Sequence, residues 1–257
     1  MKKKKGQTVL KEPLRTLRAR CIRVVSVILL IWFCSVCATV REPNPKDPFE
    51  SFNRGVYQFN YAIDKAVVRP AATIYRDAIP EFVRGMVGNF VGNLADVWSL
   101  ANSVLQGKGA VAATTFMRIN VNTVFGLGGL LDVASEMRLP QQDEDFGQTL
   151  GYWGFPSGPY LVVPFLGSTT VRDFLAWPVD AKGDILSRVH DVAARNTIKA
   201  LDVLDTRVDL LALEHMLNDA ALDRYSFVRD GFLQRRRNAV FDGDPPDEDS
   251  AEKSRAP

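Results

Sequence analysis

The sequence predicts a mainly α-helical protein that contains one irregular segment rich in glycine, proline and aromatic residues. Apolar residues recur at steps of three and four over 47–125 and over 181–237, which is the period of a helix with one buried face. Between these regions, glycine and proline interrupt residues 144–180 so often that one long regular element is excluded there. Within that segment, residues 160–163 fit a short strand, so the fold has room for one short hairpin.

The N-terminus carries the basic charge of the chain. Residues 1–23 hold nine Lys or Arg and one acid, whereas the net charge of the whole chain is only +2, so the remainder is acidic. A basic tail can bind nucleic acid, but residues 24–40 directly behind it form an apolar run without a charge. A basic region followed by such a run is the pattern of an export signal, which favours membrane targeting over nucleic-acid binding.

The apolar run leaves two forms of attachment open. Its 17 residues lie at the lower edge of what can cross a bilayer, so residues 1–40 are either a signal peptide or an uncleaved membrane anchor. In both cases the flanking positive charges keep the N-terminus cytoplasmic and send the body of the protein across the membrane.

All three cysteines, Cys21, Cys34 and Cys37, fall in the N-terminal segment. The exported body therefore has no disulfide framework and depends on its core for stability. Cys37 is the candidate for lipid attachment, because it stands where an export signal ends, shortly before an extended linker over 41–46. Bacterial lipoprotein signals usually carry Leu three residues before that cysteine and Gly or Ala directly before it, whereas Cys34 and Val36 stand here. Lipidation and plain anchoring both stay open, and either tethers the body to a membrane.

The body of the protein is expected to begin with an amphipathic helix over 48–68. The helix should end before Pro70, since the residue that precedes a proline disfavours the helical conformation. Phe59 belongs to the apolar face of this helix, and Asn53 and Asn60 lie seven residues apart beside that face. Buried amides need hydrogen-bond partners, so the two asparagines indicate more than packing.

Two further helices are expected at 80–105 and 110–125. The first carries glycines and amides around Asn89, and we expect it to break near them. The glycine-rich run 126–129 after the second helix has neither a preceding strand nor a following Lys-Ser or Lys-Thr, so it is a poor match to a nucleotide loop. We interpret it as a flexible bend between two apolar elements.

The aromatic residues of 144–180 have two interpretations between which the sequence does not decide. Either the segment is a well-packed irregular loop, or its Trp and Tyr side chains face lipid or a partner, where these residues are favoured. Helical periodicity returns over 181–237, and residues 241–257 are expected to form a disordered acidic tail. The folded domain is therefore expected to span 47–240.

No catalytic or metal-binding pattern stands out from the rest of the sequence. His190 and His215 lack the spacing of a metal site, and no Gly-x-Ser-x-Gly nucleophile motif occurs. We interpret Asp143, Glu144 and Asp145 as a solvated loop cluster, because they lack the alternating spacing of a calcium loop. We expect a protein that is not an enzyme and that uses neither a cofactor nor a metal.

A series of short motifs runs through the chain from residue 47 to about residue 180. The motifs are Asp47 to Arg54 (DPFESFNR), Val68-Arg69-Pro70, Asn89-Phe90, Gly92-Asn93-Leu94, Asn122-Thr123, Gly126 and Gly128-Gly129 with Asp132, Phe146 to Gly151, Gly158-Pro159-Tyr160, Leu161 to Gly167, and Arg172-Asp173. In this order the motifs resemble the MlaA (VacJ) family of phospholipid-handling lipoproteins of the Gram-negative outer membrane.

The resemblance implies a ring-shaped, mostly helical protein that lies within the outer membrane, at its periplasmic side. An amphipathic channel would let mislocalised phospholipid leave the outer leaflet and pass to a periplasmic lipid carrier, which would deliver it to an inner-membrane transporter. The family also associates with outer-membrane porin trimers. The candidate residues that follow are, for the channel wall, Asn53, Phe59 and Asn60, and, for a hinge, Gly126, Gly128 and Gly129.

Three functions are weighed on these grounds. The first is an outer-membrane component of an intermembrane phospholipid transport system that maintains lipid asymmetry. The alternative is a porin-associated structural lipoprotein that transfers no lipid. The third is an exported lipid hydrolase, for which the sequence lacks a recognisable nucleophile.

Overall fold

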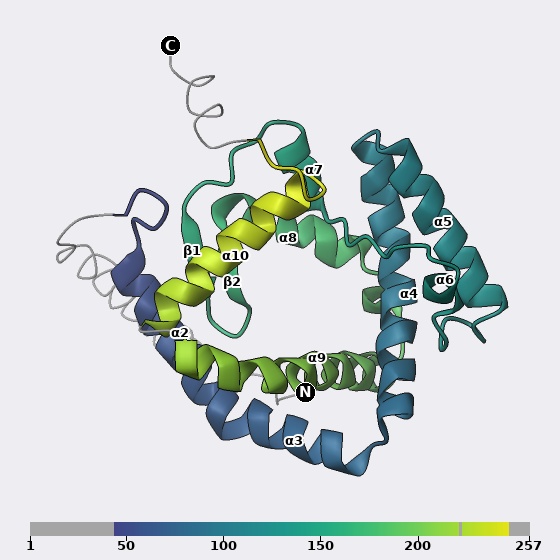
Figure 1. Ribbon diagram of the computed structural model, residues 1–257, viewed down its shortest axis with the longest axis horizontal. Coiled ribbons are helices and arrows are strands. Elements are labelled where there is room, and N and C mark those ends of the chain that lie inside the picture. Colours follow the sequence, from purple (N-terminus) through teal and green to yellow (C-terminus); the bar gives the residue numbers. More distant parts are fainter. Residues whose placement is uncertain (1–43, 221–222, 247–257) are drawn as a thin grey trace, which may run out of the picture.

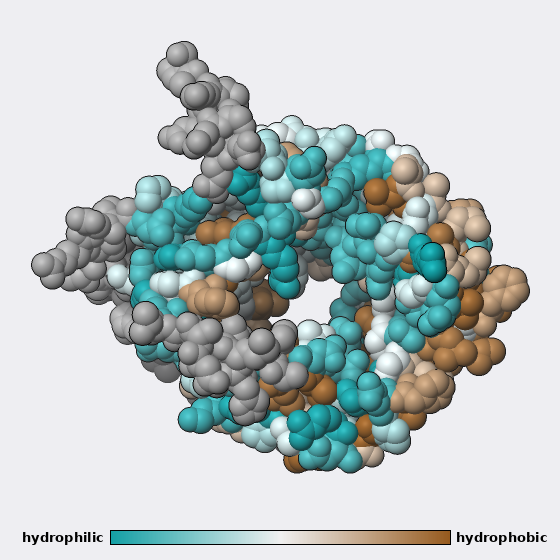
Figure 2. Space-filling model, in the orientation of Figure 1, coloured by the Kyte–Doolittle hydropathy of each residue, from teal (hydrophilic) through white to brown (hydrophobic). Residues whose placement is uncertain are grey.

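The computed structural model describes residues 44–220 and 223–246 and shows helices arranged as a ring (Figure 1). A central opening remains when all atoms are drawn (Figure 2). The mainly α-helical fold and the ring expected from the family resemblance are confirmed, with one two-stranded sheet among the described residues. The signal or anchor segment and most of the acidic tail lie outside those residues.

The chain enters the ring through one continuous helical path. It consists of α2 (Glu50–Ile63), the π-helical turn η2 (Asp64–Val68) and α3 (Arg69–Ala78). The expected end of the helix before Pro70 is wrong, because the helical path continues through this residue. Pro70 stands in the first turn of α3, directly after the π turn. The π turn shifts the hydrogen-bond pattern just ahead of Pro70, so the missing N–H of the proline leaves no bond unmade.

The next side of the ring is the pair α4 (Glu81–Leu105) and α5 (Gly109–Val124), which pack against each other (Figure 1). The expected break near Asn89 is wrong, since α4 is regular throughout. Its amides bind outside the helix instead: Asn89 donates to the carbonyl of Leu130 at 3.2 Å, and Asn93 donates to the hydroxyl of Thr123 at 3.2 Å. The amides of α4 therefore hold the last turn of α5 and the segment that follows it.

The segment rich in glycine, proline and aromatic residues is more regular than expected. After α6 (Val133–Glu136) come α7 (Phe146–Tyr152), the hairpin of β1 (Tyr160–Val163) and β2 (Gly167–Thr170), and α8 (Val171–Gly183). The hairpin is antiparallel and pairs Tyr160 with Thr170 and Val163 with Gly167, which confirms the expected strand. The Thr170 hydroxyl caps α8 by accepting from the Asp173 N–H, and the helix tolerates Pro178 in its interior.

The last helices close the ring. The short turn η3 (Leu186–Arg188) leads into α9 (Val192–Ala220), which packs on both α3 and α4. The final helix α10 (Arg224–Val240) returns across the hairpin and α7 (Figure 1). The last helix α10 therefore contacts both the beginning of the domain, at Asp47, and its middle, at α7 and β2.

Two small hydrophobic clusters form in the described residues, and a few further apolar side chains are buried outside them. One lies where α3 meets α9, around Ala72, Tyr75 and Val208. The other lies where the hairpin meets α10, around Tyr160, Val162 and Tyr225. A ring has little interior volume, so polar contacts must supply much of the remaining specificity.

Candidate functional site

The described residues show an unusual distribution of polarity. More polar than apolar side chains are buried, and the fully buried set includes Asn53, Asn102, Thr115, Arg118 and Thr149. Polar and charged residues are mostly exposed in soluble domains, so this pattern is the reverse of an ordinary globular core. The ring is held together from within by hydrogen bonds and ion pairs.

Large apolar side chains are correspondingly exposed. On α5 and the turn after it, Val124, Phe125 and Leu127 are each 68–69% exposed. Figure 2 shows an apolar band on this outer side of the ring, over the region of α5 in Figure 1. Apolar surface of this extent marks contact with a membrane or a protein partner. None of the helices in the described part of the chain is long and apolar enough to cross a bilayer.

Two of the predicted wall residues bind the hairpin to α2. The Asn53 amide donates to the Tyr160 carbonyl at 3.0 Å, and its oxygen accepts from the Val162 N–H at 2.9 Å. About two helical turns further along, Asn60 makes the same two kinds of bond. Its amide nitrogen donates to the Val163 carbonyl, and its amide oxygen accepts from the Phe165 N–H. Asn53 is completely buried and so lies within the wall rather than on its surface, whereas Asn60 is half-buried.

The N-terminal end of the domain is fixed at the same place. The Asp47 carboxylate is fully buried and accepts from the Asn53 amide at 2.8 Å, the Tyr225 hydroxyl at 2.5 Å and Arg229 at 3.4 Å. The Lys46 carbonyl accepts from the Tyr160 N–H, so the end of the linker is a packed turn rather than an extended chain. The first described residues are therefore joined firmly to the hairpin and to α10.

The three predicted hinge glycines have different structural roles. A Cβ atom on Gly126 would lie 2.2 Å from the Leu131 carbonyl oxygen and 2.4 Å from that of Asn122, so Gly126 permits close packing of the backbone. Gly128 and Gly129 adopt φ angles of 76° and 94°, which favour glycine. The turn they form is held by hydrogen bonds at both ends. Motion at this turn stays a prediction.

A buried arginine holds the polypeptide beyond that turn. Arg118 of α5 contacts both carboxylate oxygens of Asp132 at 3.1 and 3.2 Å and donates to the Leu139 carbonyl. Its Nε lies 3.5 Å from the carboxylate of Asp96 on α4. Burial raises the pKa of Asp96, and the nearby guanidinium offsets this only in part. We call these three charged residues the Arg118 clamp.

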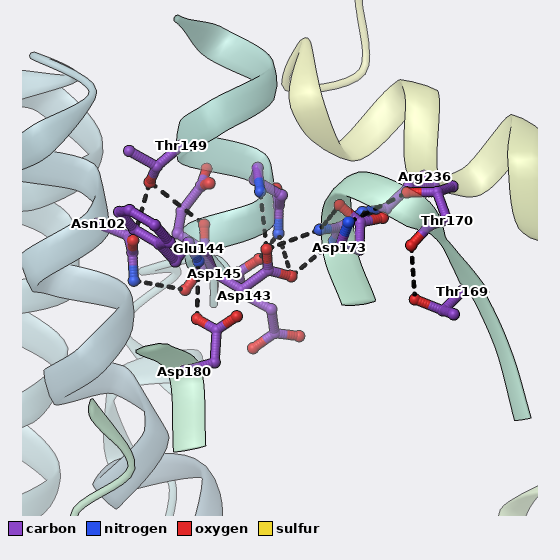
Figure 3. Close-up of polar contacts among 12 residues, drawn as sticks. Asn102, Asp143, Glu144, Asp145, Thr149, Thr169, Thr170, Asp173, Asp180 and Arg236 are labelled. Carbon is purple, nitrogen blue, oxygen red and sulfur yellow. Dashed lines mark hydrogen bonds and ion pairs between the residues drawn. The ribbon is translucent and has the colours of Figure 1, made fainter. Parts of the chain in front are cut away.

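A second polar network joins α4 to α7. Glu144 is buried, with its carboxylate accepting from the Gln106 amide at 2.8 Å and from the Lys108 ammonium at 3.0 Å. Burial raises its pKa, and these two donors counteract the rise. Thr149 of α7 donates to the amide oxygen of Asn102, as Figure 3 shows. The expected solvated cluster at 143–145 is therefore wrong for Glu144, which is buried against α4, and for Asp145, which is partly buried, whereas Asp143 is exposed as expected.

Arg236 joins three elements near that network. From α10 its guanidinium reaches Asp145, the N-cap of α7, at 2.6 and 2.7 Å, and Asp173 of α8 at 2.8 and 2.9 Å (Figure 3). Burial alone would raise the pKa of Asp145, but the Arg236 pairing outweighs it and holds the pKa below its usual value. The last helix is thus locked onto the middle of the domain.

Replacing Asp145 with asparagine tests this lock. Asparagine caps a helix as well as aspartate does, so only the ion pair is lost. We expect about 1–2 kcal/mol less stability at pH 7, a modest cost because the carboxylate is 37% exposed. Since the Asp145 pKa is lowered on folding, its contribution is present above about pH 4 and is lost as the pH falls further.

The unfolding temperature of Asp145→Asn should accordingly fall less than that of the wild type between pH 5 and pH 3, as measured by circular dichroism. Asp143→Asn is the matched control, since Asp143 is exposed beside it. Identical acid dependence in wild type and Asp145→Asn would show that Arg236 does not hold the helices together.

Comparison with known proteins identifies the family of this ring. A family model described as MlaA lipoprotein matches residues 45–239. The chain belongs to the MlaA lipoprotein family. It is 36% identical over 193 residues to the intermembrane phospholipid transport system lipoprotein MlaA of Shigella flexneri, and 35% identical over 199 residues to that of Escherichia coli strain K12. Each alignment covers 74% of this chain and 76% of the relative.

A solved structure agrees with the MlaA assignment. It is described as "Structural basis for maintenance of bacterial outer membrane lipid asymmetry" and superposes with a TM-score of 0.66 at 33% identity. The match covers 76% of this chain and 98% of the other. The resemblance inferred from the short motifs is therefore confirmed at the level of both sequence and fold.

The remaining candidates of the MlaA-like chain are placed as follows. Phe59 is 45% exposed and its ring meets that of Phe165 edge to face. His190 is exposed, and no group of three potential metal ligands occurs in the described residues. Cys37 and the side chain of His215 lie outside the part of the chain that the structure describes.

Proposed function

We propose that this protein is the outer-membrane component of an intermembrane phospholipid transport system. Tethered on the periplasmic side, it takes mislocalised phospholipid from the outer leaflet through its ring and passes it to a periplasmic carrier. It is a non-enzymatic part of that system. The observation that carries the proposal is an open ring whose polar groups are buried and whose apolar side chains are exposed.

The two halves of a phospholipid, its acyl chains and its polar head group, need different surroundings. An apolar outer surface lets the ring lie among acyl chains without the cost of burying polar groups in hydrocarbon. The central opening offers the polar head group a way past that apolar surface. The named function of the Shigella and Escherichia relatives, intermembrane phospholipid transport, supports the same conclusion.

The partners follow from this placement. A porin trimer would shield part of the exposed apolar surface within the outer membrane, and a soluble carrier would receive lipid on the periplasmic side. Either a lipid on Cys37 or an uncleaved N-terminal anchor would keep the ring at the membrane. Mass spectrometry of the mature N-terminus distinguishes a diacylated Cys37 from an intact segment.

Deletion of the gene tests the proposal in cells. Without the protein, phospholipid should accumulate in the outer leaflet, where phospholipase added to intact cells can reach it, and sensitivity to detergent should rise. Restoring the gene should reverse both changes. An outer leaflet that stays free of accessible phospholipid after deletion would refute the transport function.

The second candidate is a structural lipoprotein that binds porin and moves no lipid. It is considered because the exposed apolar surface would equally suit a protein partner. Gly128→Pro separates the two functions. Gly128 has a φ of 76° and donates its N–H to the Thr123 carbonyl, whereas proline requires a φ near −65° and has no N–H.

We expect Gly128→Pro to expose outer-leaflet phospholipid as the deletion does, while porin still co-purifies with the protein. Gly128→Asn is the matched control, because asparagine tolerates positive φ and keeps the N–H. If Gly128→Pro keeps both porin binding and a wild-type outer leaflet, the scaffold is the better description.

A further inference from the structure

The turn between β1 and β2 presents an apolar tip. We call Pro164, Phe165 and Leu166 the hairpin tip; they connect the closing pair of Val163 and Gly167. Phe165 is 76% exposed and Leu166 is 57% exposed. In Figure 1 this turn lies on the inner side of the ring, to the left of the opening. Two large apolar side chains are thus largely exposed at the turn.

Asn60 determines the conformation of the hairpin tip. Its amide nitrogen donates to the Val163 carbonyl at 3.0 Å, and its amide oxygen accepts from the Phe165 N–H at 2.8 Å. The side chain therefore brackets Pro164 and binds the backbone on both sides of it. Asn60 is thus the side chain that fixes both of these backbone groups.

Phe165 is held in a conformation that a bulky residue rarely adopts. Its φ is 66°, in the left-handed region, where a Cβ atom meets the following carbonyl. Burial does not offset this strain, because most of the ring is exposed. Its ring contacts that of Phe59 edge to face, with the ring centroids 5.4 Å apart, and Phe59 is itself 45% exposed. Strain of this kind commonly accompanies a functional contact.

The chemistry around the hairpin tip selects hydrocarbon as its occupant. Residues 146–171 contain no Asp, Glu, Lys or Arg, so the tip and both strands lack a charge that could recognise a lipid head group or a charged peptide. Together with Phe59, the tip offers two aromatic rings and a leucine. An acyl chain is the ligand that such a surface can bind without leaving polar groups unpaired.

We propose that the hairpin tip and Phe59 form an acyl-chain contact inside the ring, with Asn60 as the positioning residue that holds it there. The inference rests on the proposed lipid transport and assigns a site to the passing chain. Phe165, Leu166 and Phe59 touch hydrocarbon, whereas Asn60 acts through the backbone of the tip.

A photocrosslinker at position 165 tests the contact directly. Benzoylphenylalanine replaces Phe165 in the full-length protein in cells, and cross-linked phospholipid is identified by mass spectrometry. We expect attachment to acyl carbon atoms. Adding Asn60→Ala to the probe at 165 should lower the yield of cross-linked lipid several-fold. The control is a probe at Phe82, which is 69% exposed at the start of α4, and its yield should not change when Asn60→Ala is added. Absence of acyl adducts at 165, or a yield indifferent to Asn60→Ala, overturns the proposal.

Transport provides the second readout. Phe165→Ser should slow clearance of outer-leaflet phospholipid about tenfold, the factor expected when one aromatic contact with hydrocarbon is lost. Phe165→Leu should retain clearance, and the unfolding temperature of both should match the wild type because the ring is exposed. If Phe165→Ser clears phospholipid as fast as an active wild type, the acyl-chain contact is refuted and the transport function is not. An inactive wild type refutes the transport function, and the cross-link then decides the contact independently.

Discussion

Replacing Arg118 with alanine is expected to lower the free energy of unfolding by about 3–5 kcal/mol, the cost of breaking a buried ion pair from one side. The side chains of Arg118 and Asp96 are 2% and 1% exposed, so water cannot replace the lost guanidinium. Asp132 loses two hydrogen bonds at the same time. For a domain of this size the unfolding temperature should fall by roughly 6–20 °C.

Two further variants test whether loss of the buried charge causes this destabilisation. Arg138→Ala, on the exposed turn after α6, should leave the unfolding temperature unchanged. The double variant Asp96→Asn with Arg118→Met should recover part of the loss, because it removes a buried negative charge together with the cation. Equal stability of Arg118→Ala and Arg138→Ala would contradict the Arg118 clamp.

Substituting alanine at Gly126 is expected to cost roughly 3 kcal/mol, near the upper end of the range for overpacking. The new methyl group would overlap two carbonyl oxygens, those of Leu131 and Asn122, and neither belongs to a flexible side chain that could move aside. The backbone of the turn must therefore shift. Thermal unfolding of the purified protein in mild detergent measures the loss.

Gly55→Ala in α2 is the matched control, since nothing lies within 4 Å of a Cβ atom there. Alanine in a helix is favoured over glycine, so this variant should be as stable as the wild type or slightly more so. Gly126→Ala at wild-type stability would show that the turn has room to adjust, and the close-packing role of Gly126 would be wrong.

Local patterns sufficed for most helices and for the hairpin. The helical period located α4 and α5 closely, because each has an apolar face and ends at a clear signal. Asn53 and Asn60 were identified as amides that need partners, and both have them. The partners are backbone groups of the hairpin, more than 100 residues away, and no local pattern indicates which distant strand an amide will meet.

The polar residues that hold the ring together could not be found in the same way. Arg118 lies in α5 and Arg236 lies in α10, and the sequence pattern of a helix predicts that a charged side chain belongs to its solvated face. Burial arises only when α4, α7 and α8 assemble around them. The break expected in α4 was wrong for the same reason, because Asn89 is stabilised by a bond outside its helix. Long-range contacts decided each of these positions.

Lipid transfer by the purified protein shows whether the ring provides a route for phospholipid. Full-length protein is placed in vesicles that contain a fluorescent phospholipid, the periplasmic carrier from the same cells is added, and labelled lipid bound to the carrier is followed over time. We expect the carrier to load faster from these vesicles than from protein-free vesicles. Equal loading rates, with a carrier that still takes up lipid from micelles, would contradict it.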